Sequence, residues 1–416
     1  MKPSPLRARH FERILIVKLS AVGDVIHTVP VLAKLRARYP SARIDWLLTP
    51  EIAELIRHHP ALSNVLLFER QKYGRVGRNW DATLSLFRLV ATLRRNRYDL
   101  VLDLHGQFRT ALLTLATGAP VRVGFDRPRR ESQRDYLRRV GRSACWHGWT
   151  GAREGAWLAY THRIPIPTLD VHAVDRYLWV GQLLGLDDGP PDFRIPLPAR
   201  AQERVDQLLA QQGLTGRPFA VLMPGTIWET KHWRAEGFAE VGRRLLEAGL
   251  GVVLAGSPRE RQRCRAVAAS CPGARDLSGQ TTLTELAALI CRAALAVTND
   301  SGPMHLTVAL GRPVVSIFGP TDPVWIGPYG RPHAVVQAAV PCAPCYLKKL
   351  RCCPHEHVCM QQVTADAVFE RVERILAEAG TPLPRRPLPA APASSHCGMD
   401  NRMDTTVAGR SPTPAG

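Results

Sequence analysis

Residues 297–307 read Val-Thr-Asn-Asp-Ser-Gly-Pro-Met-His-Leu-Thr, and they continue an apolar run, residues 293–297, that is typical of a buried strand. Pro303 stands where the first turn of a helix is expected, a position that suits proline because the first helical N–H groups have no partner inside the helix. A helix that starts directly after a strand presents free N–H groups and its positive dipole end to the neighbouring crevice. A second apolar run, residues 313–318, leads into Gly-Pro-Thr-Asp-Pro. We expect these two loops to bind a diphosphate.

The beginning of the chain has the pattern of a strand–helix–strand unit. An apolar run, residues 14–17, is followed by the loop Lys-Leu-Ser-Ala-Val-Gly-Asp (18–24), by apolar residues at helical spacing, and by a second strand, residues 43–48. Open parallel sheets bind ligands at the carboxyl ends of their strands, so this loop is a candidate functional loop. Gly23 permits a close approach there. Asp24 either caps the helix or takes part in chemistry.

The same alternation of strands and helices runs through both halves of the chain. Further strands are expected near residues 64–68, 98–104 and 121–125, and in the second half near 219–223 and 251–255. Residues 161–200 are rich in proline and glycine and are the best candidate for an interdomain linker. The pattern predicts an α/β protein with two parallel-sheet domains that face a cleft. The predicted parts are an N-terminal domain (12–188), a C-terminal domain (189–362), a final helix (363–380) and a disordered tail (381–416).

Composition limits the possible partners and locations. The chain has 416 residues, of which 45% are hydrophobic and 22% charged, and ten are cysteine. We find no apolar run long enough to span a membrane, and no cleavage site after the apolar N-terminal run, so we expect a cytoplasmic protein with reduced thiols or a metal site. The formal charge of +19 calls for an anionic partner, unless it reflects the arginine bias of a GC-rich genome. The arginines are dispersed and no nucleic-acid-binding motif is present, so we expect no nucleic acid.

Two basic loops follow predicted strands on the expected ligand side. They are His-Gly-Gln-Phe-Arg (105–109) and Asp-Arg-Pro-Arg-Arg-Glu-Ser (126–132), and a third basic segment covers residues 70–78. Each is either a solvated surface or a site for an anionic acceptor. Their position at the carboxyl ends of strands keeps the acceptor hypothesis open.

Four stretches together resemble glycosyltransferase family 9, which includes the bacterial ADP-heptose:lipopolysaccharide heptosyltransferases. These stretches are residues 16–30, 231–233, 299–306 and 318–323, and the resemblance spans about residues 12–375. It implies the GT-B fold, two Rossmann-like domains with the acceptor on the first and the nucleotide-sugar on the second. It also implies transfer of L-glycero-D-manno-heptose from ADP-heptose, with inversion and without a catalytic metal. The implied acceptor is the Kdo/heptose inner core of lipid A, at the inner-membrane surface.

The resemblance also implies roles for individual residues. The attacking hydroxyl must lose a proton, and the carboxylate that accepts it in the family corresponds to Asp24. The departing diphosphate gains charge that cations and N–H dipoles can stabilise. Donor-binding positions of the family correspond to Thr226, Lys231, Asp300, Ser301, Gly302, Met304 and His305.

Four further correspondences are looser. Glu260 matches a glutamate that holds the ribose hydroxyls, although stabilisation of the first turn of a helix is its plainer role. Arg75, Arg78 and Arg130 are expected to meet the carboxylates of Kdo or the phosphates of lipid A. The loops that carry these arginines vary within the family.

A cysteine-rich segment departs from the best-known members. It runs Cys-x2-Cys-x6-Cys-Cys-x5-Cys from residue 342 to residue 359, with two histidines inside. This density of ligands fits a structural zinc or iron site, and unliganded or redox-active thiols are the alternative. The segment resembles an iron-binding motif of the autotransporter heptosyltransferases, whose acceptor is a protein serine. We therefore keep protein O-heptosylation as an alternative function and predict as metal ligands Cys342, Cys345, Cys352 and Cys359.

Other classes of protein explain the sequence less well. A dehydrogenase would carry Gly-x-Gly-x-x-Gly after its first strand, and residues 21–24 lack it. A GT-B sugar-nucleotide epimerase would share the two domains and bind the donor, but it would need no acceptor. A non-catalytic nucleic-acid binder would show salt-dependent binding and no donor hydrolysis.

Overall fold

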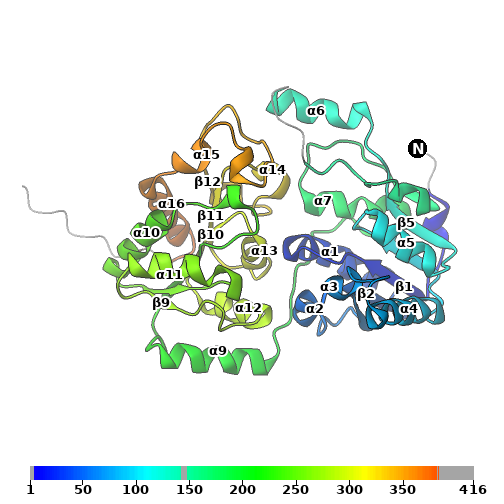
Figure 1. Ribbon diagram of the computed structural model, residues 1–416, viewed down its shortest axis with the longest axis horizontal. Helices are drawn as coiled ribbons and strands as arrows, with labels where there is room; N and C mark the ends of the chain where they lie inside the picture. The colour runs from blue at the N-terminus through cyan, green and yellow to red at the C-terminus, as the bar shows by residue number, and fades with distance from the viewer. Residues whose placement is uncertain (1–3, 142–147, 382, 384–416) are drawn as a thin grey trace, which may run out of the picture. The chain divides into compact units, whose positions relative to one another are not determined.

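Two parallel sheets of the same topology form the framework of the protein. The computed structural model describes residues 4–141, 148–381 and 383. Each sheet has six strands, in the orders β3-β2-β1-β4-β5-β6 and β12-β11-β10-β7-β8-β9, and every strand pair is parallel. Counted from its own first strand, the second sheet repeats the order of the first. The predicted pair of Rossmann-like lobes is confirmed (Figure 1).

The first lobe alternates strands and helices from β1 to α8. Its elements are η1 (Pro5–Ala8), β1 (Arg13–Val17), α1 (Val22–Arg38), β2 (Arg43–Leu48), α2 (Pro50–Ile56), β3 (Asn64–Leu67), α3 (Arg70–Tyr73), α4 (Trp80–Arg95), β4 (Leu100–Asp103), α5 (Phe108–Ala116), β5 (Val121–Phe125), α6 (Arg130–Val140), η2 (Ala156–Ala159), β6 (His162–Ile164), α7 (Ala173–Leu178) and α8 (Val180–Leu184).

The second lobe repeats this alternation and adds a C-terminal segment. Its elements are α9 (Ala199–Gln211), β7 (Phe219–Met223), η3 (Glu229–Lys231), α10 (Ala235–Glu247), β8 (Gly251–Leu254), η4 (Pro258–Glu260), α11 (Arg261–Ala269), β9 (Arg275–Asp276), α12 (Leu283–Arg292), β10 (Leu295–Asn299), α13 (Gly302–Ala309), β11 (Val314–Phe318), α14 (Pro323–Ile326), η5 (Pro332–Ala334), β12 (Val335–Gln337), η6 (Leu350–Cys352), α15 (Val358–Gln361) and α16 (Ala365–Glu378).

The side chains of β1 show why the strands read as continuous apolar runs. Ile14 and Ile16 pack on one face of the sheet, in the core that includes the inner side of α1, whereas Leu15 and Val17 pack on the other face, against α4 and α5. All four are fully buried. A parallel sheet covered by helices on both faces buries both sets of alternating side chains, so its inner strands are apolar throughout.

The strand order fixes where a ligand can bind. In each sheet the order reverses between the first and the fourth strand, which are β1 and β4 in one lobe and β7 and β10 in the other. The helices that follow these two strands diverge to opposite faces, and a crevice opens at the carboxyl ends of the strands. The loops after these four strands carry Asp24, His105, Thr226 and Asp300.

Part of the predicted linker is structured. Residues 161–200 contain β6, α7 and α8, and the two longest stretches without a helix or strand are residues 165–172 and 185–198. The boundary predicted at residue 188 falls in the second of these stretches and stays a prediction. The final helix is α16, which begins after the Thr364 cap and packs against α10 and β11. Nearly all of the predicted tail lies outside the described residues.

In the described part of the chain, no helix combines the length and the apolar character needed to cross a bilayer.

Candidate active site

Asp24 lies in the first turn of α1, and both of its carboxylate oxygens accept hydrogen bonds. The hydroxyl of Tyr177 donates to Oδ1 over 2.9 Å, and the N–H of Ala21 donates to Oδ2 over 3.2 Å. The ammonium of Lys18 lies 3.5 Å from Oδ1. Asp24 therefore caps the N-terminus of α1, the structural role that the sequence analysis offered for it. Its side chain nevertheless stays 44% exposed, so it remains open to a substrate.

These partners set the charge state of Asp24. Burial acts to raise its pKa, but Lys18 and then the hydrogen bond from Tyr177 outweigh it, and the pKa lies below the usual range. Lys18 is 5% exposed, and burial lowers its pKa despite the neighbouring carboxylate. Asp24 is thus an ionised carboxylate near neutral pH. An ionised carboxylate with an open side is what a general base requires.

The loop after β4 brings His105 to the same place. Asp103, at the end of β4, is fully buried and accepts hydrogen bonds from the N–H groups of His105 and Gly106 and from the hydroxyl of Tyr160. Burial, with help from Lys18, lowers the pKa of His105 to about 4. His105 is therefore a neutral imidazole close to Asp24.

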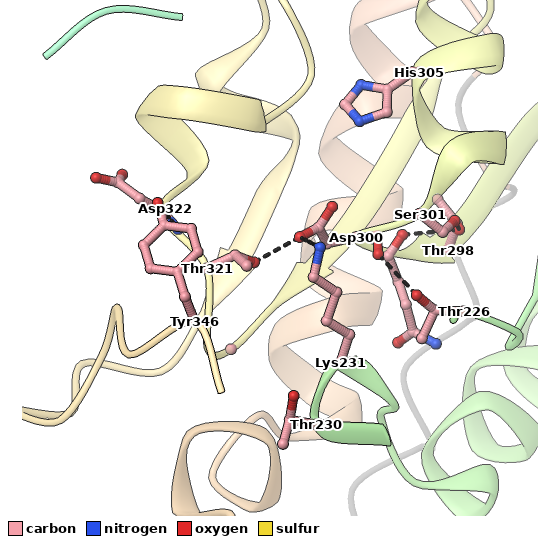
Figure 2. A network of polar contacts seen from close by, with 12 residues as sticks. Thr226, Thr230, Lys231, Thr298, Asp300, Ser301, His305, Thr321, Asp322 and Tyr346 are labelled. Carbon is pink, nitrogen blue, oxygen red and sulfur yellow. Dashed lines mark hydrogen bonds and ion pairs between the residues drawn. The ribbon is translucent and has the colours of Figure 1, made fainter. Parts of the chain in front are cut away.

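The donor-side residues form a second polar network in the other lobe. The ammonium of Lys231 lies 2.6 Å from Oδ2 of Asp300, and the hydroxyl of Thr321 donates to the same oxygen over 2.5 Å. The hydroxyl of Thr226 donates to the backbone carbonyl of Asp300 over 3.1 Å. Figure 2 shows Lys231, Asp300 and Thr321 pointing toward one another. Lys231 also lies 4.3 Å from the centre of the Trp228 ring.

The start of α13 closes this network. Ser301 is the residue before the helix, and its hydroxyl shares a hydrogen bond of 3.0 Å with Thr298 (Figure 2). Pro303 stands in the first turn, as the sequence predicted. Met304 has its side chain in the hydrophobic core, while its N–H bonds to Ser301. The side chain of this predicted donor-binding residue therefore packs rather than facing the crevice.

The N-termini of α1 and α13 meet across the two lobes. A Cβ added to Gly23 would lie 2.4 Å from the ring of His305, and one added to Gly302 would lie 2.9 Å from Cβ of Val22. Only glycine allows backbones to approach so closely. The positive N-terminal ends of α1 and α13, and Asp24 with them, therefore lie close to Asp300 and Ser301, the two residues that precede α13.

Three histidines pack together at the contact between the lobes. Nε2 of His27 lies 2.9 Å from Nδ1 of His305, in hydrogen-bonding distance, and His172 packs edge-on against His27. Nε2 of His172 in turn bonds to the carbonyl of Gly327 in the second lobe. Burial lowers the pKa of His305 to about 4, that of His172 to about 3, and that of His27 well below the ordinary value. All three are neutral in the folded protein.

The looser predictions have different outcomes. Glu260 accepts a hydrogen bond from the N–H of Ser257, the helix-end role, and also fills the space beside Gly225 in the loop after β7. Arg75, Arg78 and Arg130 are exposed, and no carboxylate in the described parts of the chain pairs with them. No contact in the structure joins these arginines to Asp24, so their predicted role remains a prediction.

The cysteine-rich segment braces the donor loop. The hydroxyl of Thr230 donates to the carbonyl of Leu347 over 2.5 Å, and Nε2 of His357 lies 2.6 Å from the carbonyl of Thr230. The N–H of Leu350 donates to the carboxylate of Glu229. The segment thus fixes the turn from which Lys231 extends.

Three other thiols of the cysteine-rich segment lie near Cys359. Burial raises the pKa of Cys359 to about 12, and the nearby thiols of Cys345, Cys342 and Cys353 act in the same direction, whereas Cys352 is exposed. Among the described residues, no group of three or more His, Cys, Asp or Glu side chains is placed to hold a metal ion. The site stays a prediction, and no step below depends on it.

A cavity of about 830 Å³ lies elsewhere. It is lined by Lys34, His59, Asp187 and Leu310, among others, and by none of the predicted site residues. Lys34 is buried there and bonds to Asp187 and to the carbonyl of Gly189 in the interlobe connection.

Sequence reasoning placed Lys18 and His105 in candidate functional loops, which follow β1 and β4 at the reversal of the sheet, but it gave neither residue a role of its own. It did not find Tyr177. Tyr177 lies in α7, 153 residues from Asp24, and no local pattern marks it.

Comparison with known proteins identifies the family of the chain. The family profile of glycosyltransferase family 9 (heptosyltransferase) matches residues 86–147 and 136–353. Lipopolysaccharide heptosyltransferase 1 of Pseudomonas aeruginosa is 32% identical over 342 residues, which cover 81% of this chain and 86% of that protein. An E. coli heptosyltransferase solved with ADP-2-deoxy-2-fluoro heptose superimposes with a TM-score of 0.64 at 26% identity, covering 87% of this chain and 99% of that one.

A further solved structure supports the fold. A family 9 glycosyltransferase from Veillonella parvula has a TM-score of 0.69 at 22% identity, covering 89% of this chain and 98% of that one. With the reversed-order sheets, the facing helix ends and the matched profile in agreement, the chain belongs to glycosyltransferase family 9 and has the GT-B fold.

Proposed function

We propose that this glycosyltransferase moves a heptosyl group from ADP-heptose to the Kdo/heptose inner core of lipopolysaccharide, with inversion and without a catalytic metal. The support for the heptosyl group is the kinship with heptosyltransferases, one of which was solved with an ADP-heptose analogue. The support for the mechanism is the arrangement of Asp24, Lys231 and the start of α13.

The proposed step is a single displacement. The acceptor hydroxyl oxygen forms a bond to the anomeric carbon, and the bond from that carbon to the β-phosphate oxygen breaks on the opposite face. The hydroxyl proton passes to the carboxylate of Asp24, and ADP leaves with the electron pair. Lys231 and the N–H groups at the start of α13 face the charge that develops on the diphosphate. One displacement inverts the anomeric centre.

One observation carries the proposal. An ionised, partly exposed carboxylate of the first lobe stands where α1 meets the N-terminus of α13, the helix that follows Asp300. Charges of both Asp24 and Asp300 act on His305, so both carboxylates lie near this one imidazole. This proximity of the proposed base in one lobe and the proposed anion site in the other supports the proposal.

The test uses the purified protein with ADP-heptose and either Kdo-lipid A or heptosyl-Kdo-lipid A. We expect the mass of one acceptor to increase by one heptose, in the presence of EDTA, and we expect no gain with Asp24→Ala. A gain on neither acceptor, with a folded protein, contradicts the proposal. Transfer to a serine of an autotransporter passenger protein would instead establish the protein-modifying alternative, and conversion of the donor without any acceptor would indicate an epimerase.

A further inference from the structure

The outer face of α5 is apolar although it is exposed. Phe108, Leu112 and Leu115 follow one another at spacings of four and three, so they lie on one side of the helix. Their exposed fractions are 54%, 50% and 46%. The opposite side of α5, with Ala111 and Leu113, packs into the cores of the lobe. The helix is thus apolar on both sides, which a purely solvated surface helix is not.

The neighbouring elements continue this surface. Trp80 and Phe87 are seven residues apart on α4, and they are 79% and 67% exposed. Leu158 of η2 is 76% exposed. Both α4 and η2 contact α5. We define the apolar face as Trp80, Phe87, Phe108, Leu112, Leu115 and Leu158. It holds most of the large exposed apolar side chains in the described residues, and a concentration of this kind marks an interaction site.

The charges around the apolar face are predominantly positive. Exposed arginines lie along α4, before it and at the start of α5, and none pairs with a carboxylate of the described chain: Arg75, Arg78, Arg88, Arg94, Arg95 and Arg109. The acidic residues nearest to them in sequence or by contact with α5 are Asp81, Asp99 and Glu154, and the carboxylate of Asp99 accepts hydrogen bonds from the N–H groups of Glu12 and Arg13. Apolar and aromatic side chains with unpaired arginines beside them are the composition of surfaces that insert into the headgroup region of anionic bilayers.

The apolar face begins at the same edge of the sheet as Asp24. Trp80 and Phe108 are the first residues of α4 and α5, so both lie at the carboxyl edge of the sheet, as Asp24 does. The two helices cover the sheet face opposite to α1. The donor side, where α1 meets α13, is therefore left free when the apolar face is occupied.

We infer that the apolar face docks on an anionic phospholipid bilayer and that docking presents a lipid-linked acceptor to Asp24. The second part rests on the proposed function, whereas the first stands on the surface alone. A second copy of the chain is the other possible occupant. Self-association would bring the unpaired arginines of two copies together, and like charges at an interface oppose binding.

The first experiment measures co-sedimentation of the full chain with vesicles that contain no lipopolysaccharide. We expect binding to vesicles of phosphatidylethanolamine and phosphatidylglycerol, weakened by salt, and little binding to phosphatidylcholine alone. Leu112→Ser/Leu115→Ser should weaken binding by at least about tenfold, because two leucines no longer leave water. Trp80→Ser/Phe87→Ser is a second variant with the same expected loss.

The control is Leu350→Ser, which removes a leucine of similar exposure, 45%, from the second lobe and should bind like the unaltered chain. Failure of the unaltered chain to bind anionic vesicles overturns the inference, and so does equal binding by both double variants. If the unaltered chain binds no vesicles but sediments as a dimer, and the double variants sediment as monomers, the face is a self-association surface instead.

Enzyme assays separate this inference from the proposed function. With an acceptor embedded in vesicles, the double variants should lose activity in parallel with binding. With a deacylated, water-soluble acceptor they should remain as active as the unaltered chain. If no acceptor is used by the unaltered chain, the proposed function fails while the vesicle result still decides the docking surface.

Discussion

Asp24 and Tyr177 form the most informative pair in the molecule. The phenol donates to one oxygen of the carboxylate, a backbone N–H donates to the other, and Lys18 lies beside the first. Hydrogen bonds to the ionised form hold the carboxylate in one orientation and favour its charge. Tyr177 is therefore a positioning residue, and Asp24 is the proposed base.

Replacement of the base should remove most of the chemistry. Asp24→Asn keeps the size and a carbonyl acceptor for Tyr177 but cannot take a proton. We expect kcat to fall by roughly 10²- to 10⁴-fold, the usual contribution of a general base, with little change in KM for the donor. Steady-state kinetics would check this. Asp81→Asn, at an exposed acid in the first turn of α4, is the control that should leave kcat unchanged.

Removal of the phenol should change the pH profile. Tyr177→Phe deletes one of the interactions that lower the pKa of Asp24, so that pKa rises. Because the base works only when ionised, the acid limb of kcat against pH should move to higher pH, with a kcat loss of roughly tenfold. Tyr329→Phe removes a hydrogen bond from Tyr329 to Asp175 on the same helix and should leave the limb in place. A limb that does not move in Tyr177→Phe refutes the positioning role.

At the scale of elements, the contact between α1 and α13 decides the geometry of the site. Gly23 and Gly302 bring the two helix ends together, and His305 fills the space above Gly23. A larger residue at position 23 would push the ring of His305, and with it the start of α13, away from Asp24.

This contact can be tested by a double-mutant cycle. Gly23→Ala should destabilise the protein by about 1–3 kcal/mol, the usual cost of overpacking, and should also reduce kcat/KM. His305→Ala removes the ring, so the double variant should be less destabilised than the sum of the single changes. Gly74→Ala, where an added Cβ meets its nearest neighbour at 3.5 Å, is the control. Strict additivity would show that the two residues do not press on each other.

The helices and strands differ in how well they can be predicted from the sequence. The inner strands were predicted because burial on both faces makes them continuous apolar runs, and residues 121–125 and 219–223 coincide with β5 and β7. The edge strands β6, β9 and β12 were missed, since they have two or three residues and little apolar pattern. In the site, motif residues such as Lys231 and Asp300 do lie together, whereas Tyr177 depended on a tertiary contact that no local pattern encodes.

At the scale of the whole molecule, the buried histidines link the lobes to pH. Each has a lower pKa in the folded than in the unfolded chain, so the unfolded chain binds more protons below the ordinary value of 6.5. The neutral histidines therefore make their full contribution to the free energy of unfolding above pH 6.5. This contribution is lost as the pH falls toward about 4, the pKa of His305.

We therefore expect the melting temperature to decrease between about pH 7 and pH 5. The contribution of His305 alone is on the order of 3 kcal/mol at the neutral end, given its shift from 6.5 to about 4. His27→Gln should make the melting temperature less dependent on pH in that range. His58→Gln, at an exposed histidine, should leave the dependence as it is. An unchanged slope in His27→Gln would contradict the role of the cluster.

The cysteine-rich segment invites a direct measurement. If the predicted metal site forms, purified protein should contain about one zinc or iron per chain, and Cys342→Ser should lose it. Because the segment braces the turn of Lys231, loss of the metal should raise KM for the donor more than it lowers kcat. A metal-free chain with full activity would leave the thiols without this role.

The paired glycines at the helix junction also bear on how such enzymes can diversify. A side chain at position 23 or 302 would collide with His305 or Val22, so a mutant library that varies these positions would mostly yield destabilised proteins. The basic loop before α4 is exposed, and a Cβ added at Gly77 would meet no neighbour, although the positive φ of that residue favours glycine. New acceptor preferences can therefore be sought by exchanging that loop between relatives, with the glycine junction kept constant.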